Sequence, residues 1–141
     1  MWEPFTERSR RLIVLTQEKA QLRGSRTIDV GDFISALADQ DDAIGAAVRR
    51  SVDFEQFPPG RSPIESTKEM VFSRGAKRII EKAFAQARLL GDNFIGTAHL
   101  LLGALEGDPP LSLVAGADPQ RFRDDVVAAR FGDAPPTSTT S

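Results

Sequence analysis

Apolar residues recur at helical spacing in the second half of the chain. One row consists of Ile79, Ile80, Ala83, Phe84, Ala87 and Leu90. This spacing places all six on one face of a helix and fits no strand. Ser73 is placed to cap the start of this helix, and Gly91 to end it in a left-handed conformation. Thr97 is the expected N-cap of a second helix. The hairpin over 72–105 therefore has one apolar side that needs a partner.

The partner is an earlier copy of the same pattern, 67 residues upstream. Identical or similar residues coincide at this shift: Phe5-Thr6 with Phe72-Ser73, Arg11 with Arg78, Ala20 with Ala87, Gly24 with Gly91 and Ile28 with Ile95. Each copy can supply the core that the other lacks. We therefore predict an all-α fold of two helical repeats, related by a pseudo-twofold axis and packed as one domain over 1–131. Copy one covers about 5–52, a connecting loop 53–71, copy two about 72–131 and a disordered tail 132–141.

Capping residues and prolines define the other expected helices. Thr6 is the expected cap of the first helix, which runs to about residue 23, and Asp29 caps the second, with Asp32 completing a capping box. A third helix is expected over 42–51. A short helix is expected from Pro109 or Pro110 towards residue 114, and a last helix from Asp118-Pro119.

Composition narrows the function classes. The chain carries 18 basic and 20 acidic residues, with a net charge of −2, which disfavours a general nucleic-acid binder. It has no cysteine and one histidine, so disulfides and thiolate sites are excluded and a metal site is disfavoured. No stretch has the roughly 20 apolar residues that span a bilayer, and the first residues lack the apolar core of a signal peptide. We expect a cytoplasmic protein.

Catalytic motifs are missing from the sequence. No G-x-x-x-x-G-K-[ST] loop occurs, which argues against an ATPase. His99 is the one candidate acid-base group, with Asp92 as the nearby acid in sequence. A lone histidine inside a helix is more often a structural hydrogen-bonding residue than a catalyst. We therefore expect neither enzymatic activity nor a cofactor.

Aromatic residues are concentrated at the beginnings of the two long helices. Trp2 and Phe5 precede the first, and Phe72 precedes the second. If these leading ends approach one another, they border a groove with Arg10 and Lys77 inside it, which suits peptide recognition. The alternative for the two phenylalanines is that they close the core as N-terminal staples.

The repeated pattern also resembles a known family. FTERSRRLIVLTQEKA in the first copy and RLLGDNFIGTAHLLLGAL in the second are similar to the N-terminal repeat domain of the Clp unfoldases, above all the ClpC branch, over about residues 2–131. The resemblance implies two repeats of about four helices, the first eroded after Gly24. In full-length relatives this domain precedes ATPase modules and receives substrates and adaptors. The sequence therefore indicates a monomeric peptide- or protein-binding module, or an N-terminal fragment of a full-length unfoldase.

Two ligand-binding sites of the family are retained to different degrees in this sequence. The family's I-G-T-E-H pattern implies acids that read phosphorylated arginine, but Gly31 and Ala98 stand at those positions, so this reading is expected to be lost. The positions matching the family's site for cyclic-peptide antibiotics largely keep their chemistry. They are Trp2, Arg10, Ile13, Phe72, Lys77 and Glu81. A decoy that sequesters such peptides is therefore an alternative function.

Overall fold

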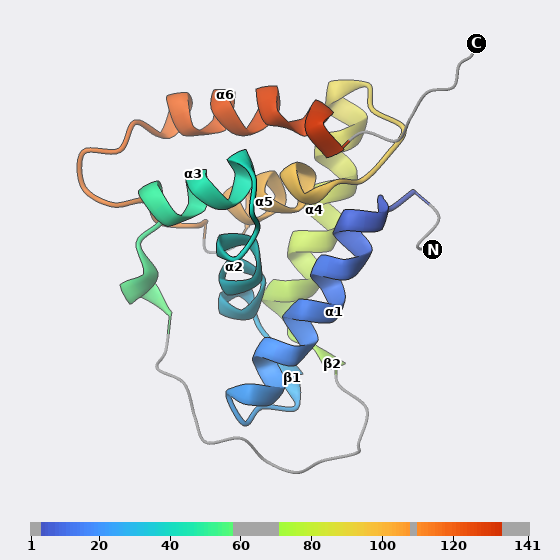
Figure 1. Cartoon of the computed structure of the whole chain (residues 1–141), viewed down its shortest axis with the longest axis vertical. Helices are drawn as coiled ribbons and strands as arrows, with labels where there is room; N and C mark the ends of the chain where they lie inside the picture. Colours follow the sequence, from blue (N-terminus) through green and yellow to red (C-terminus); the bar gives the residue numbers. More distant parts are fainter. Residues whose placement is uncertain (1–3, 58–70, 108–109, 134–141) are drawn as a thin grey trace.

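The computed structural model describes residues 4–57, 71–107 and 110–133, and these residues confirm an all-α fold. Short parallel strands and two 3-10 helices accompany the α-helices (Figure 1). In chain order the elements are α1 (Glu7–Leu22), β1 (Thr27–Ile28), α2 (Val30–Ala38), α3 (Ala43–Ser51), η1 (Phe54–Gln56), β2 (Val71–Phe72), α4 (Arg74–Leu90), α5 (Thr97–Leu105), α6 (Pro119–Ala129) and η2 (Arg130–Asp133). Among the described residues each repeat has three α-helices followed by a 3-10 turn, instead of the expected four or so helices.

The two repeats exchange short extended segments. Ile28 of the first repeat pairs with Phe72, and Phe5 pairs in the same parallel sense with Ile95 of the second. Backbone hydrogen bonds repeat this relation, since the Ser73 amide donates to the Ile28 carbonyl at 2.8 Å and the Thr6 amide to the Ile95 carbonyl at 3.0 Å. The 67-residue shift turns Phe5 into Phe72 and Ile28 into Ile95, so each contact is the counterpart of the other. The arrangement is the expected pseudo-twofold.

This exchange corrects one expectation, that the leading ends of the long helices meet. The start of α1 lies beside Ile95, just after the end of α4, and the start of α4 lies beside Ile28, just after the end of α1. The two helices therefore run in opposite directions, as Figure 1 shows. With 16 residues in α1, the two leading ends are separated by about one helix length, or about 24 Å.

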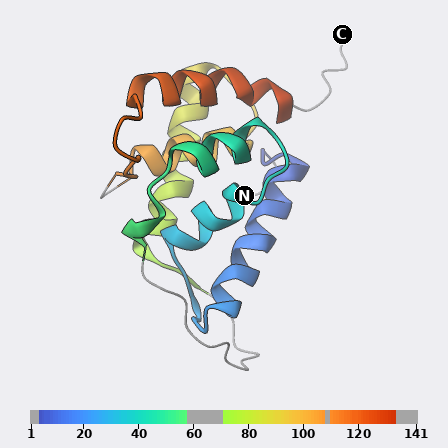
Figure 2. The same cartoon turned by 60° about the vertical axis from the view of Figure 1, so that its left-hand side comes forward.

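The core is centred on α2 and α5. Every residue of α5 from Thr97 to Ala104 is buried, and Phe33, Ile34 and Leu37 of α2 are fully enclosed. Helices α3 and α6 lie side by side and cover the core, α3 against α2 and α6 against α5 (Figures 1 and 2). A helix that is apolar on all sides needs such cover on every side, which explains why two repeats form one domain.

Most helix ends are those that the sequence predicts. Thr6, Asp29, Asp42 and Ser73 each accept a first-turn amide, and Gly91 has the left-handed φ of 74°. Asp118 caps α6, with Pro119 as its first residue.

Two local predictions are wrong. The N-cap of α5 is Gly96, and Thr97 is already the first helical residue. The expected short helix before residue 114 is absent from the described residues 110–116. Leu113 instead pairs with Val52, and the Val114 amide donates to the Ser51 carbonyl at 2.8 Å. These pairings replace a single helical turn, which is costly to nucleate by itself.

The helices are also too short or too polar to cross a membrane, as far as the described residues extend.

Candidate functional site

The structure separates the predicted binding residues into buried and exposed groups. Phe5 is 3% exposed, and its ring meets Phe84 edge-to-face with centroids 5.7 Å apart. Ile13 is also part of the core. Of the two alternatives for Phe5, its position is that of a staple. Both side chains therefore contribute mainly to the core.

The exposed group lies mainly at the start of α4. Phe72 is half-buried and stacks on Phe33 with centroids 6.1 Å apart, while Lys77 and Glu81 are exposed. Arg10 is exposed on α1, at the other end of the pseudo-twofold pair. Trp2 lies outside the described residues. The structure therefore does not gather the predicted residues around one groove.

Lys77 and Glu81 help to line a hollow of about 390 Å³. Its other lining residues are Arg74, Gly75 and Arg78. Three cations thus face one carboxylate, and the ion pair between Arg78 and Glu81 is long at 3.6 Å. No acidic residue occupies the first turn of α4. Cations at a helix N-terminus oppose the helix dipole, so an anionic ligand would relieve unfavourable electrostatics there.

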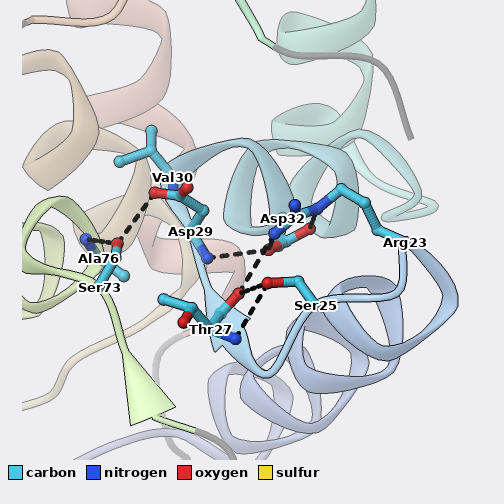
Figure 3. A network of polar contacts seen from close by, with 8 residues as sticks. All are labelled: Arg23, Ser25, Thr27, Asp29, Val30, Asp32, Ser73 and Ala76. Atoms are coloured by element: carbon cyan, nitrogen blue, oxygen red, sulfur yellow. Dashed lines mark hydrogen bonds and ion pairs between the residues drawn. The ribbon is translucent and has the colours of Figure 1, made fainter. Parts of the chain in front are cut away.

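The start of α2, behind this hollow, is a closed polar network (Figure 3). The Asp29 carboxylate accepts from the Val30 amide at 3.1 Å and from the Ser73 hydroxyl at 2.9 Å. The Asp32 carboxylate accepts from both Arg23 Nε and Nη2, at 3.0 and 2.8 Å. Because Arg23 donates these hydrogen bonds to Asp32, the pKa of Arg23 is raised above its ordinary value. These polar groups are hydrogen-bonded to one another, and the bond between Ser73 and Asp29 joins the two repeats.

His99 occupies the position in the second repeat that corresponds to Asp32. It is 0% exposed, its Nδ1 accepts from the Gly96 amide at 2.9 Å, and its Nε2 lies 2.8 Å from Asp92. Arg130 Nε donates to the same Asp92 oxygen at 2.8 Å. Both ring nitrogens therefore have a hydrogen-bond partner. These contacts agree with the hydrogen-bonding role expected for His99.

The positions of the family's two acids offer no ionic site. Ala98 is buried at the start of α5. A Cβ on Gly31 would lie 3.3 Å from the Phe57 side chain, so this position is also crowded. Neither residue has a group that could pair with a guanidinium.

A second hollow has no counterpart in the sequence analysis. It measures about 310 Å³ and lies between the starts of α1, α3 and α5 and the turn η2. Its polar lining residues are Arg8, Asp42, Thr97 and Asp133. The sequence predicts a disordered tail over 132–141, yet Gly132 and Asp133 belong to η2. The sequence signal for this hollow is the repeat register. Thr6, beside the start of α5, is the equivalent of Ser73, beside the start of α2.

Comparisons of the sequence and of the fold with known proteins give consistent results. The family described as the Clp repeat (R) N-terminal domain matches residues 4–117. Chloroplastic chaperone protein ClpC2 of Arabidopsis thaliana is 34% identical over 140 residues, which cover 90% of this chain but 15% of that protein. Chloroplastic ClpC1 of rice is likewise 34% identical over 90% of this chain, and again only 15% of its length is matched.

Solved structures show the same fold. The N-terminal domain of the chaperone ClpD from Arabidopsis thaliana superimposes with a TM-score of 0.63 at 20% identity, covering 94% of this chain and 97% of that one. The Hsp104 N-terminal domain from Candida albicans gives a TM-score of 0.61 at 18% identity, over 89% of this chain and 91% of that one.

Proposed function

Because the chain belongs to the Clp N-terminal repeat domain family, we propose that it is a non-enzymatic module that binds a peptide segment of a protein substrate or adaptor. The observation that carries the proposal is the cationic hollow of about 390 Å³ at the start of α4, with the half-buried ring of Phe72 two residues before the helix. An apolar anchor beside clustered like charges suits a segment that has an aromatic residue and acidic residues. The same module would serve as the receiving domain of a longer unfoldase.

A binding titration tests this proposal. The probe is a fluorescein-labelled peptide with two glutamates on each side of a phenylalanine, followed by fluorescence polarisation. Replacing Arg74 and Lys77 together by alanine should weaken binding at least about tenfold, or about 1.4 kcal/mol. Arg88→Ala removes an exposed cation at the opposite end of α4 and should leave affinity unchanged. Equal affinity of all three proteins would refute the assignment of this hollow.

A second proposal is that the module sequesters cyclic peptides. It is favoured by the accessibility of Lys77 and Glu81, which match the family's cyclic-peptide site and line the same hollow. A ligand that binds the native state at 100 times its Kd adds about 2.7 kcal/mol to the free energy of unfolding. Thermal unfolding with a saturating cyclic-peptide antibiotic measures this directly. An unchanged melting temperature excludes the decoy function and leaves the first proposal standing.

We also propose that this module does not recognise phosphoarginine. Gly31 and Ala98 lack carboxylates, and their surroundings are packed. Isothermal titration with free phosphoarginine should give no measurable heat. A micromolar or tighter Kd would contradict this.

A further inference from the structure

A third hollow lies where the end of α3 meets the start of α6. The two helices run side by side in opposite directions (Figures 1 and 2), so the last residues of α3 face the first turns of α6. The hollow measures about 200 Å³ and shares no lining residue with the hollows at the starts of α4 and α5. Both repeats contribute to its lining, which consists of Arg50, Ser51, Ala117, Asp118, Arg121, Phe122 and Asp125.

Backbone contacts between the repeats hold the walls of this hollow in place. The Val114 amide donates to the Ser51 carbonyl at 2.8 Å, which ties the end of α3 to the segment that leads into α6. That segment turns at Gly116, which has the left-handed φ of 89°. Phe122 is 4% exposed and belongs to the core. The hollow therefore has a fixed backbone around it and an apolar floor.

The four charged side chains of the hollow do not pair with one another. Within the described residues, no ion pair involves Arg50, Arg121 or Asp125. Asp118 caps α6 through Oδ1, which accepts from the amides of Gln120 and Arg121, and its Oδ2 has no partner in the same part of the chain. The hollows at the starts of α4 and α5 differ in this respect, because each contains an ion pair.

Helix geometry explains why these charges stay apart. Arg121 and Asp125 are four residues apart on α6, but a base that precedes its acid along a helix is in the less favourable order for such a pair. Arg121 also lies in the first turn of α6, where a cation opposes the helix dipole. A ligand that brings an anion to the two arginines and a cation to the two aspartates would therefore gain favourable interactions with all four groups.

The volume of the hollow limits such a ligand to a few atoms. A water molecule takes up about 30 Å³ in the liquid, so the hollow has room for roughly six or seven non-hydrogen atoms. An α-amino acid with a small side chain, such as L-alanine, is of this size. It carries an ammonium group and a carboxylate on the same carbon, and its side chain is apolar. These properties match the two kinds of charge around the hollow and the apolar floor beneath them.

We propose that this hollow binds a free α-amino acid with a small side chain. The carboxylate of the ligand lies between the guanidinium groups of Arg50 and Arg121. Its ammonium group lies at the carboxylates of Asp118 and Asp125, and its side chain rests on Phe122. Because Arg50 belongs to the first repeat and the other four residues to the second, the bound amino acid joins α3 to α6 and stabilises their packing. This inference goes beyond the proposed function and uses none of its residues, so either can fail while the other holds.

The test is a titration of the folded protein with L-alanine, followed by the backbone amide resonances in NMR. Saturable shifts are expected at Ser51, Ala117 and Phe122 at millimolar concentration or below. Two analogues show whether both charges are needed, since propionate keeps only the carboxylate and L-alaninamide only the ammonium group. Each analogue should bind at least about tenfold more weakly than L-alanine, because it loses the charged hydrogen bonds of the missing group.

Variants with matched controls locate the site. Asp125→Asn should weaken L-alanine binding at least about tenfold, whereas Asp124→Asn, which removes the same charge one residue away and outside the hollow, should not. Arg50→Gln should act like Asp125→Asn, with Arg88→Gln as its control. All four residues are exposed, so the variants are expected to fold. The proposal is overturned if L-alanine gives no saturable shifts at these amides, if either analogue binds as tightly as L-alanine, or if Asp125→Asn and Arg50→Gln bind L-alanine as the unaltered protein does.

Discussion

Phe5 and Phe72 are pseudo-symmetric residues with different burial, and truncating each tests what its ring does. Phe5 is 3% exposed and contacts Phe84 edge-to-face, whereas Phe72 is only half-buried. Removing a buried phenylalanine ring costs about 3–5 kcal/mol, including the cavity left behind. Since Phe5 lies just before α1, where the chain can partly collapse into the space, we expect a loss of about 3 kcal/mol for Phe5→Ala. Phe72→Ala should cost about half as much.

Chemical denaturation followed by circular dichroism measures both losses. For a domain of 141 residues, 3 kcal/mol corresponds to a fall in the melting temperature of about 10 °C. The labelled peptide supplies the second readout: Phe72→Ala should weaken its binding, and folded Phe5→Ala should not. A loss below about 1 kcal/mol for Phe5→Ala, or weaker peptide binding by that variant while it is folded, would show that Phe5 faces the ligand and that its role as a staple is wrong.

Two further predictions concern stability. Arg23→Lys should lower the free energy of unfolding by about 2 kcal/mol although it keeps the charge, because lysine cannot reproduce the two-pronged hydrogen bond to the buried Asp32. Urea unfolding measures this loss. A lysine variant as stable as the unaltered protein would contradict the prediction. Gly103→Ala should destabilise the protein by more than about 2 kcal/mol, since its Cβ would overlap the carbonyl oxygen of Ile79, whereas Gly132→Ala has open space and serves as the control. Equal melting temperatures for these two glycine variants would show that α4 and α5 can separate at little cost.

Much of the secondary structure could be predicted because its causes are local. An apolar row such as Ile79 to Leu90 forms one face only in a helix, and Ser73 and Asp29 satisfy amides one to three residues away. Gly91 ends α4 because it tolerates a left-handed backbone. The repeat was visible for the same reason, since both copies carry the same local signals in the same order.

The tertiary structure decided which helix faces pack together and which helix ends lie next to each other. The donors and acceptors that join Phe5 to Ile95 and Phe72 to Ile28 are backbone groups, and every residue has them. The sequence therefore left open whether the leading helix ends meet or lie a helix length apart. The burial of Ile13 likewise depends on which helix faces pack together.

Asp133 shows this division most clearly. In the sequence it is one acid near a polar tail, and nothing marks it as the cap of a helix that begins at Thr97. Its role exists only because the folded chain brings η2 to a helix start where Gly96 has no side chain. Local chemistry along the chain determined the helices and their repetition, whereas the long-range packing of the repeats determined which polar groups share a site, because contacts between distant segments depend on the path of the whole backbone.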